Sequence, residues 1–275
     1  MQANKISQFI FQSLLSILLF ATAYLSLSKV DWVRIFDFPS AISASEQKTG
    51  EILSAAINEF GPPIEDQNVV LAVDSIIDRV CLSNSINPNS IQLHIISKED
   101  VNAFAMPGGH LVLFTGLINE CRNSDELAGV LCHEIAHIRL NHTYLKLTKE
   151  IGIAVISSIA GGSGGPEAIK LALETISSTA YDRSLESEAD SKAVELLVNA
   201  DIDPIQLSIF LEVLSKEENA SEHIDFISTH PNLKKRSGDI HKKYDSYPHH
   251  GEFYPALSNE VWKELKRKIE QIQYR

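Results

Sequence analysis

The chain of 275 residues has little cysteine, a shortage of basic residues and no internal repeat or low-complexity segment. Its three cysteines, Cys81, Cys121 and Cys132, have no metal-ligand spacing and allow at most one disulfide, which excludes a disulfide scaffold and a cysteine-based metal site. Lysine and arginine number 24 against 36 aspartates and glutamates, a formal net charge of −12 at pH 7. The sequence also has no basic stripe, and both features argue against nucleic-acid binding.

The N-terminus contains the longest uncharged run. Residues 9–28 are twenty uncharged residues rich in leucine, isoleucine and phenylalanine, the length of a membrane-spanning helix. We expect an uncleaved N-terminal anchor, and signal-peptide cleavage near Ala23 is the alternative. The expected division is an anchor with the start of a linker in residues 1–35, followed by one folded domain in residues 36–275. A hydrophobic content of 44% is sufficient for one sizeable core or two small ones.

The most informative pattern is an H-E-x-x-H motif, His133-Glu134-Ile135-Ala136-His137. On an α-helix, residues four apart lie about 40° apart around the axis, one turn from each other. Both imidazoles can therefore reach one zinc ion, and Glu134 lies beside them as a general base. The alternative is an ordinary solvated helix face that carries two histidines and a glutamate.

The residues around the motif favour a buried helix. Ser124 or Asp125 is a suitable N-cap, because a short polar side chain can accept hydrogen bonds from the first free backbone N–H groups. Apolar residues then recur with helical spacing, at Leu127, Val130, Leu131, Ile135 and Ile138. His142 lies about 140° around a continuous helix from His137, so we expect a structural role for it.

Catalytic zinc usually has three protein ligands and one open position. If residues 182–190 are helical, Glu186 and Asp190 lie one turn apart on one face, whereas Glu188 points nearly the opposite way. We assign Glu186 to the metal and Asp190 to a hydrogen bond with a ligand histidine. The alternative is a solvated acidic face with Arg183 as its counter-ion.

The expected fold is α+β, mainly helical, with a small antiparallel sheet beside the motif helix. Residues 91–96 alternate in polarity and read as a strand, and residues 102–106 and 110–115 form two more strands around the turn Pro107-Gly108-Gly109. The apolar, glycine-rich residues 151–165 are too short to span a membrane comfortably and read as a helix and loop near the cleft.

The chain resembles the HtpX and CaaX-prenyl-protease type family of membrane-associated zinc metallopeptidases. The resemblance covers about residues 65–240 and rests on motifs in the expected order, which are Asn102–Gly109, Thr115–Leu117, His133–His137, Glu186–Asp190, Ser228–Pro231 and Arg236. It implies a zincin-like fold. HtpX and the prenyl proteases span the membrane several times, whereas this chain has one convincing span, so it looks closer to single-anchor or periplasmic quality-control members.

The resemblance implies one Zn²⁺ per chain, with His133, His137 and Glu186 as ligands and Glu134 as general base and acid. His230 would lie close to the metal, either to stabilise the oxyanion or to occupy the open position in a self-inhibited resting state. Arg236 would support the His230 loop. The substrate would add as an extended strand to an exposed edge, which is either the partner strand 110–114 or the strand formed by Asn102, Ala103, Phe104, Ala105 and Met106.

The expected function is a zinc-dependent endopeptidase that hydrolyses unfolded or misassembled membrane or envelope proteins through a zinc-activated water. The alternative is a latent protease that acts as a zinc-stabilised chaperone or assembly factor. We expect the catalytic domain on the non-cytoplasmic, periplasmic side of the membrane, or a secreted or periplasmic protein if the leader is cleaved. The oligomeric state does not follow from the sequence.

Overall fold

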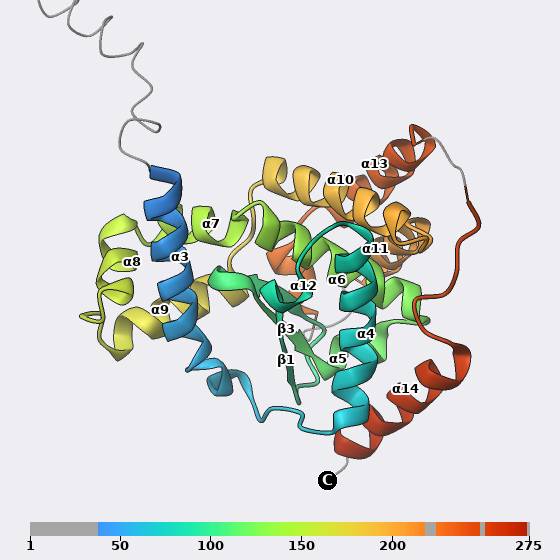
Figure 1. Cartoon of the computed structure of the whole chain (residues 1–275), viewed down its shortest axis with the longest axis horizontal. Helices are drawn as coiled ribbons and strands as arrows, with labels where there is room; N and C mark the ends of the chain where they lie inside the picture. Colours follow the sequence, from blue (N-terminus) through green and yellow to red (C-terminus); the bar gives the residue numbers. More distant parts are fainter. Residues whose placement is uncertain (1–37, 218–223, 248–250, 274–275) are drawn as a thin grey trace, which may run out of the picture. The chain divides into compact units, whose positions relative to one another are not determined.

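The structure of this chain is a computed structural model that describes residues 38–217, 224–247 and 251–273 (Figure 1). The expected anchor, residues 9–28, lies outside these ranges. None of the described helices has an apolar stretch long enough to cross a bilayer. The chain divides into two compact units, residues 1–44 and 45–275. The described part of the first unit is residues 38–44, the start of helix α3.

The described residues are mostly helical, with three short strands between helices α4 and α5. The strands and the short helical turns are β1 (Gln92–Ile96), β2 (Ala103–Met106), β3 (His110–Phe114), η1 (Ile57–Phe60), η2 (Pro88–Ser90) and η3 (Pro107–Gly109). The helices are α3 (Phe38–Ser54), α4 (Gln67–Ser83), α5 (Thr115–Glu120), α6 (Ser124–Arg139), α7 (His142–Glu150), α8 (Ile153–Ala160), α9 (Pro166–Ser178), α10 (Arg183–Asn199), α11 (Ile205–Glu217), α12 (Asp225–Thr229), α13 (Leu233–Asp245) and α14 (Asn259–Gln273). The α+β, mainly helical class expected from the sequence is confirmed.

The sheet is mixed, which corrects the expectation of an antiparallel one. Its order is β1-β3-β2, with β3 parallel to β1 and antiparallel to β2. The chain passes from β1 to the far edge, forms β2, and returns through a turn in which Gly108 and Gly109 have φ of 77° and 86°. Glycine adopts such positive angles without steric cost. The returning strand then fills the middle position and runs in the same direction as β1.

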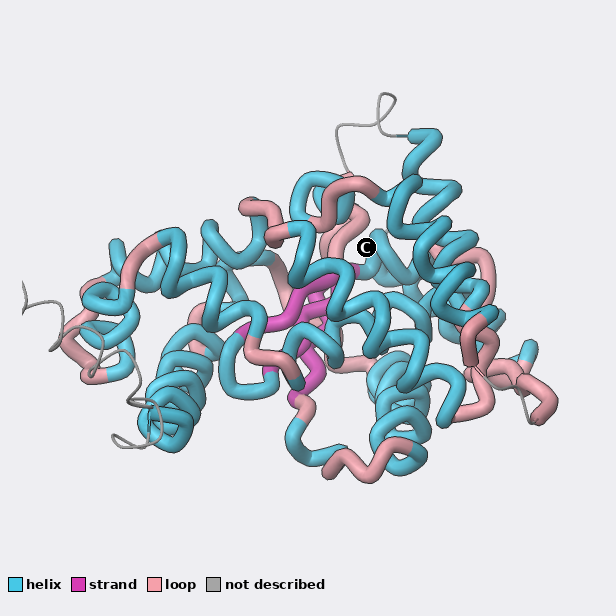
Figure 2. The backbone as a smooth tube through the Cα atoms, turned by 90° about the horizontal axis from the view of Figure 1, so that it is seen from above, coloured by secondary structure: helices cyan, strands magenta, loops and turns pink. Residues whose placement is uncertain are grey.

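Both faces of the hairpin formed by β2 and β3 are buried, whereas β1 is buried only at Ile95 and Ile96. Alternate side chains of the hairpin enter different cores, because successive residues of a strand point to opposite faces. Ala103, Leu111 and Leu113 join the cluster that contains the motif helix α6. Phe104 and Val112 join a second cluster with residues of α3, α8 and α9. Figure 2 shows the strands at the centre, with helices around them. The sheet therefore serves as a rigid support for the helix that carries the motif.

The N-cap of helix α6 lies one residue before Ser124 and two before Asp125, the two expected caps. Asn123 is the N-cap, and its side-chain oxygen accepts hydrogen bonds from the backbone N–H groups of Asp125 and Glu126. Residues Glu126 to His137 are all buried, against α10, α11 and the sheet. Because the helix is enclosed, its polar residues have partners from several other elements.

Gly129 allows α6 to approach α11 closely. A Cβ atom at Gly129 would lie 2.8 Å from Cβ and 3.1 Å from Cα of Leu207. We expect Gly129→Ala to lower the free energy of unfolding by about 1–3 kcal/mol, because the two helices would have to separate. Urea denaturation measures this change. The matched control is Gly238→Ala in α13, where a Cβ meets nothing within 4 Å. Equal stability of the two variants would contradict the packing argument.

Candidate metal centre

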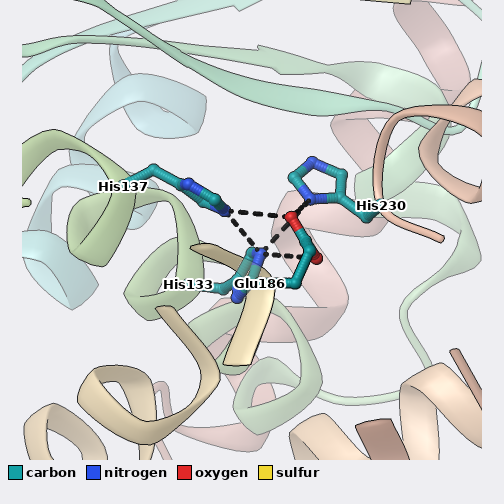
Figure 3. A group of neighbouring side chains, drawn as sticks. All are labelled: His133, His137, Glu186 and His230. Carbon is teal, nitrogen blue, oxygen red and sulfur yellow. Dashed lines mark hydrogen bonds and ion pairs between the residues drawn. The ribbon is translucent and has the colours of Figure 1, made fainter. Parts of the chain in front are cut away.

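Helix α6 presents His133 and His137 to the same point. Their side chains lie one turn apart, both are fully buried, and their Nε2 atoms are 3.0 Å apart. Glu186 comes from the first turn of α10, with Oε1 3.4 Å from His137 Nε2 and Oε2 3.7 Å from His133 Nε2. Three separate positions in the sequence thus converge in one buried cluster, as Figure 3 shows.

His230 is the fourth member of this cluster. It follows α12 directly, and its Nδ1 lies 3.0 Å from Glu186 Oε1 and 3.3 Å from His133 Nε2. One ligand atom from each of the four residues lies within 4.8 Å of the others. The structure therefore brings together the three predicted ligands and the predicted nearby histidine. Their roles toward a metal remain predictions.

The cluster fits a zinc ion. Zn–N and Zn–O bonds of about 2.0–2.2 Å in a tetrahedron require ligand atoms about 3.3–3.6 Å apart. The five separations given above run from 3.0 to 3.7 Å, and all four ligand atoms lie within 4.8 Å of one another. Burial lowers the pKa of His137 to about 3 and that of His230 to about 4, so both are neutral near pH 7 and have lone pairs available. Nitrogen and carboxylate donors are also the types that zinc prefers.

Glu134 lies between the cluster and strand β2. Its Oε2 accepts a hydrogen bond of 2.9 Å from the backbone N–H of Ala105. Its Oε1 faces His230 Nε2 at 3.5 Å, and among the described residues neither of these two buried atoms has a hydrogen-bond partner. Burial, and then the charge of Glu186, raise the pKa of Glu134 well above its usual value. Such a carboxyl group is suited to accept and return a proton.

Asp190 and Arg236 lie directly behind the cluster. Asp190 Oδ1 is 3.1 Å from His133 Nδ1, and the Arg236 guanidinium donates to both carboxylate oxygens of Asp190, at 2.8 and 2.7 Å. Burial alone raises the pKa of Asp190, but the Arg236 charge and its hydrogen bonds outweigh this and lower it to about 2. Arg236 also pairs with Glu186 and donates to the His230 backbone oxygen at 3.3 Å. This arrangement is the one assigned from the sequence.

His142 is closer to the site than the sequence argument placed it. Its Nδ1 lies 3.1 Å from Nδ1 of His137, and its Nε2 lies 3.4 Å from the exposed Glu188. The angular argument assumed one continuous helix, but α6 ends at Arg139 and Asn141 turns the chain with φ of 56°. His142 therefore contacts the ring nitrogen of His137 that faces away from Glu186. An asparagine at the end of a helix is the signal that could have indicated this turn.

Two further residues at the site were not identified from the sequence. The Tyr181 ring stacks on the His137 ring, with centroids 4.0 Å apart and an interplanar angle of 25°. The Tyr181 hydroxyl lies 2.8 Å from Thr143 Oγ1, which donates to the backbone oxygen of Ala105 at 3.1 Å. Both side chains are buried. Neither position has a local sequence pattern that distinguishes it from ordinary core residues.

Strand β2 is one of the two edge strands of the sheet, but it is not exposed. Each of the five predicted substrate-binding residues is at most 1% exposed, these being Asn102, Ala103, Phe104, Ala105 and Met106. Helices α7 and α9 pack against the strand. The expectation of an exposed edge was therefore wrong, and the alternative strand 110–114 is excluded as an edge because β3 is central. Substrate binding along β2 remains a prediction.

Comparison with known proteins gives consistent matches. The sequence model described as Peptidase family M48 matches residues 69–243, more than half of the chain. A protein of Arabidopsis thaliana named mitochondrial metalloendopeptidase OMA1 is 31% identical over 148 residues, 54% of this chain and 30% of that protein. The beta-barrel assembly-enhancing protease of Escherichia coli (strain K12) is 26% identical over 212 residues, which cover 72% of this chain and 43% of that protein. The beta-barrel assembly-enhancing protease of Yersinia pestis is 23% identical over 239 residues, which cover 82% of this chain and 48% of that protein. The chain thus spans half or less of these relatives' lengths.

The convergence of the four side chains predicts that each primary ligand is needed for metal binding. We expect wild type to hold one zinc per chain and His137→Ala to lose it, because only two of the three predicted primary ligands remain. Metal analysis of the purified proteins measures this directly. His241→Ala, at an exposed histidine on α13, is the control and should retain zinc. Full zinc occupancy in His137→Ala would exclude His137 as a ligand.

The buried neutral histidines predict that acid destabilises the metal-free protein. The folded-state pKa values of His137 and His230, about 3 and 4, lie below the ordinary 6.5. Their contribution to the free energy of unfolding is therefore complete above pH 6.5 and is lost as the pH falls from 6.5 toward these folded-state values. Each such histidine contributes a slope of up to about 1.4 kcal/mol per pH unit. Denaturation of metal-free protein between pH 7.5 and 4.5 measures the slope. His230→Gln should reduce it, and an unchanged slope would contradict the assignment.

Proposed function

Because this chain belongs to Peptidase family M48, we propose that it is a zinc-dependent endopeptidase of unfolded or misassembled membrane or envelope proteins. The expected class, a metalloendopeptidase, is confirmed by the family and by the named relatives. The resemblance seen in the sequence holds at the level of this family, and the HtpX-type subgroup remains a prediction. The observation that carries the proposal is the buried cluster of His133, His137, Glu186 and His230, with Glu134 beside it.

In the proposed reaction the cluster would hold zinc through His133, His137 and Glu186. The ion would supply a Lewis acid that polarises a water molecule and the scissile carbonyl. Glu134 takes a proton from the attacking water and later delivers it to the leaving amine, for which its raised pKa is suited. Asp190 holds the orientation of the His133 ring through Nδ1, and Arg236 keeps Asp190 ionised.

His230 gives the proposed enzyme a resting state. Its Nδ1 lies among the other ligand atoms, 3.0 Å from Glu186 Oε1 and 3.3 Å from His133 Nε2, so His230 would hold the ion as a fourth ligand (Figure 3). A catalytic zinc needs that position for water or substrate. We therefore propose that His230 withdraws during turnover and that its ring then helps to stabilise the oxyanion. Its backbone, which Arg236 holds through the carbonyl oxygen, would be the pivot.

The proposed substrates are extended polypeptides that pair with β2. Pairing with a strand edge reads backbone groups, so we expect loose side-chain preference, as suits unfolded or misassembled proteins. Relatives named for mitochondria and for β-barrel assembly support a protein-quality-control role at a membrane or envelope. We also propose a single anchor in residues 9–28, with residues 36–275 on the non-cytoplasmic side.

A second function is favoured by the buried edge strand. With β2 fully covered and His230 in the cluster, the described state is closed to a polypeptide. A latent protease that acts as a zinc-stabilised chaperone or assembly factor would have this structure. The two proposals differ in whether the protein hydrolyses peptide bonds with Glu134 as the proton acceptor.

The role of Glu134 gives the decisive test. We expect Glu134→Gln to retain one zinc per chain while cleavage of fluorescein-labelled casein falls by at least about 100-fold, since the proton acceptor is lost but no ligand is. The measurement uses the full chain purified in detergent, with zinc content determined on the same samples. The control is Glu174→Gln at an exposed carboxylate on α9, which should cleave as wild type does.

The outcomes separate the two functions. Cleavage by wild type and the control but not by Glu134→Gln would establish the endopeptidase. Residual activity equal to wild type in the zinc-loaded Glu134 variant would remove Glu134 from the mechanism. Zinc in all three proteins without cleavage in any of them would favour the chaperone.

A further inference from the structure

The backbone of Ala105 is the place where the catalytic carboxylate meets the edge of the sheet. In an antiparallel pair, alternate residues of a strand exchange hydrogen bonds with the partner strand. The Phe114 N–H donates to the Asn102 oxygen at 3.1 Å, so Asn102 and, two residues further on, Phe104 direct their backbone groups toward β3. Ala105 must therefore direct its N–H and C=O outward. These are the groups that an added strand would use.

Both outward groups of Ala105 already have partners. The N–H donates to Glu134 Oε2 at 2.9 Å, and the C=O accepts from Thr143 Oγ1 at 3.1 Å. A carboxylate acceptor and a hydroxyl donor thus occupy the two places at which a paired strand would present its own C=O and N–H. All of these atoms belong to buried residues.

The direction of the hydrogen bonds follows from the proton count. A threonine hydroxyl has one proton, which it directs to the Ala105 oxygen, since a carbonyl can only accept. The Tyr181 hydroxyl, 2.8 Å from Thr143 Oγ1, must then be the donor of that bond. The Tyr181 ring is held between His137, on which it stacks, and the Lys146 Nζ, which lies 4.2 Å from its centroid. Tyr181 therefore orients the Thr143 hydroxyl from a fixed position at the metal cluster.

We propose that Thr143, oriented by Tyr181, and Glu134 together take the place of a substrate strand on Ala105, and that a bound polypeptide displaces them and so frees the Glu134 carboxylate. Thr143 and Tyr181 are positioning residues in this scheme, because they act through the Ala105 backbone. The proposal rests on the proposed endopeptidase function and adds how substrate reaches the edge. It also explains how the base can be held inactive without a substrate.

The exchange is close to neutral in hydrogen bonds. A substrate N–H replaces the Thr143 hydroxyl at the Ala105 oxygen, and a substrate C=O replaces Glu134 at the Ala105 N–H. Glu134 is then released toward the space where its Oε1 and His230 Nε2 face each other at 3.5 Å. The displaced Thr143 hydroxyl competes directly with the substrate. Removal of this hydroxyl should therefore strengthen substrate binding. If the hydroxyl served only to stabilise the fold, its removal would weaken substrate binding instead.

The test compares Thr143→Val, which keeps the shape but loses the hydroxyl, with Thr143→Ser, which keeps the hydroxyl. The probe is fluorescein-labelled β-casein, and its binding to the zinc-free full chain in detergent is measured by fluorescence anisotropy, so that no cleavage occurs. We expect Thr143→Val to bind about three- to tenfold more tightly than wild type, the equivalent of one competing hydrogen bond, and Thr143→Ser to bind as wild type does. The same zinc-loaded proteins should show the difference in KM.

A double variant guards against misfolding. Thr143→Val leaves the Tyr181 hydroxyl without its acceptor, so Thr143→Val with Tyr181→Phe removes both polar groups together, which costs less stability. It should bind casein as tightly as the single valine variant. Binding by Thr143→Val and the double variant that is equal to or weaker than that of wild type would overturn the proposal. Cleavage of casein by the zinc-loaded wild type is measured separately. The binding experiment can therefore contradict the displacement proposal while the cleavage experiment still supports the endopeptidase function.

Discussion

The buried Arg236 guanidinium is the interaction on which the whole site depends. It pairs with Asp190 and Glu186 of α10 and holds the backbone oxygen of His230, so one side chain joins α10, α13 and the loop after α12. Buried charges are costly unless they are paired and hydrogen-bonded. Both carboxylates that contact this guanidinium are ionised, because its charge holds the pKa of Glu186 and of Asp190 below their usual values.

The motif helix α6 is enclosed by its neighbours over most of its length. Its N-terminal half packs against α11 through Gly129, and its C-terminal half presents His133, Glu134 and His137 between the sheet and α10. Burial keeps the histidines neutral and raises the pKa of Glu134. Rigid packing and ionisation state are thus two consequences of one feature of the fold.

The described state is closed at every point that a polypeptide would use. His230 is among the ligand atoms, β2 lies beneath α7 and α9, and the outward groups of Ala105 are hydrogen-bonded to Glu134 and Thr143. Each of these contacts uses a residue near the proposed chemistry. In the proposed scheme, the side chains that keep the site closed are therefore the same ones that carry out the reaction.

The sequence by itself determined the mainly helical α+β class and the pairing of His133 with His137 and of Glu186 with Asp190 on single helix faces, because a spacing of four residues is a local property of helices. The meeting of these pairs with His230 was implied by the resemblance, which holds at the level of Peptidase family M48, and the tertiary structure brings them together. Only the tertiary structure decided the parallel pairing of β1 with β3 and the burial of β2, since strand order and covering helices depend on distant segments. It also decided the place of His142, because Asn141 ends the helical geometry on which its angle was calculated. Thr143 and Tyr181 have no periodic signature, and only packing brings them to Ala105.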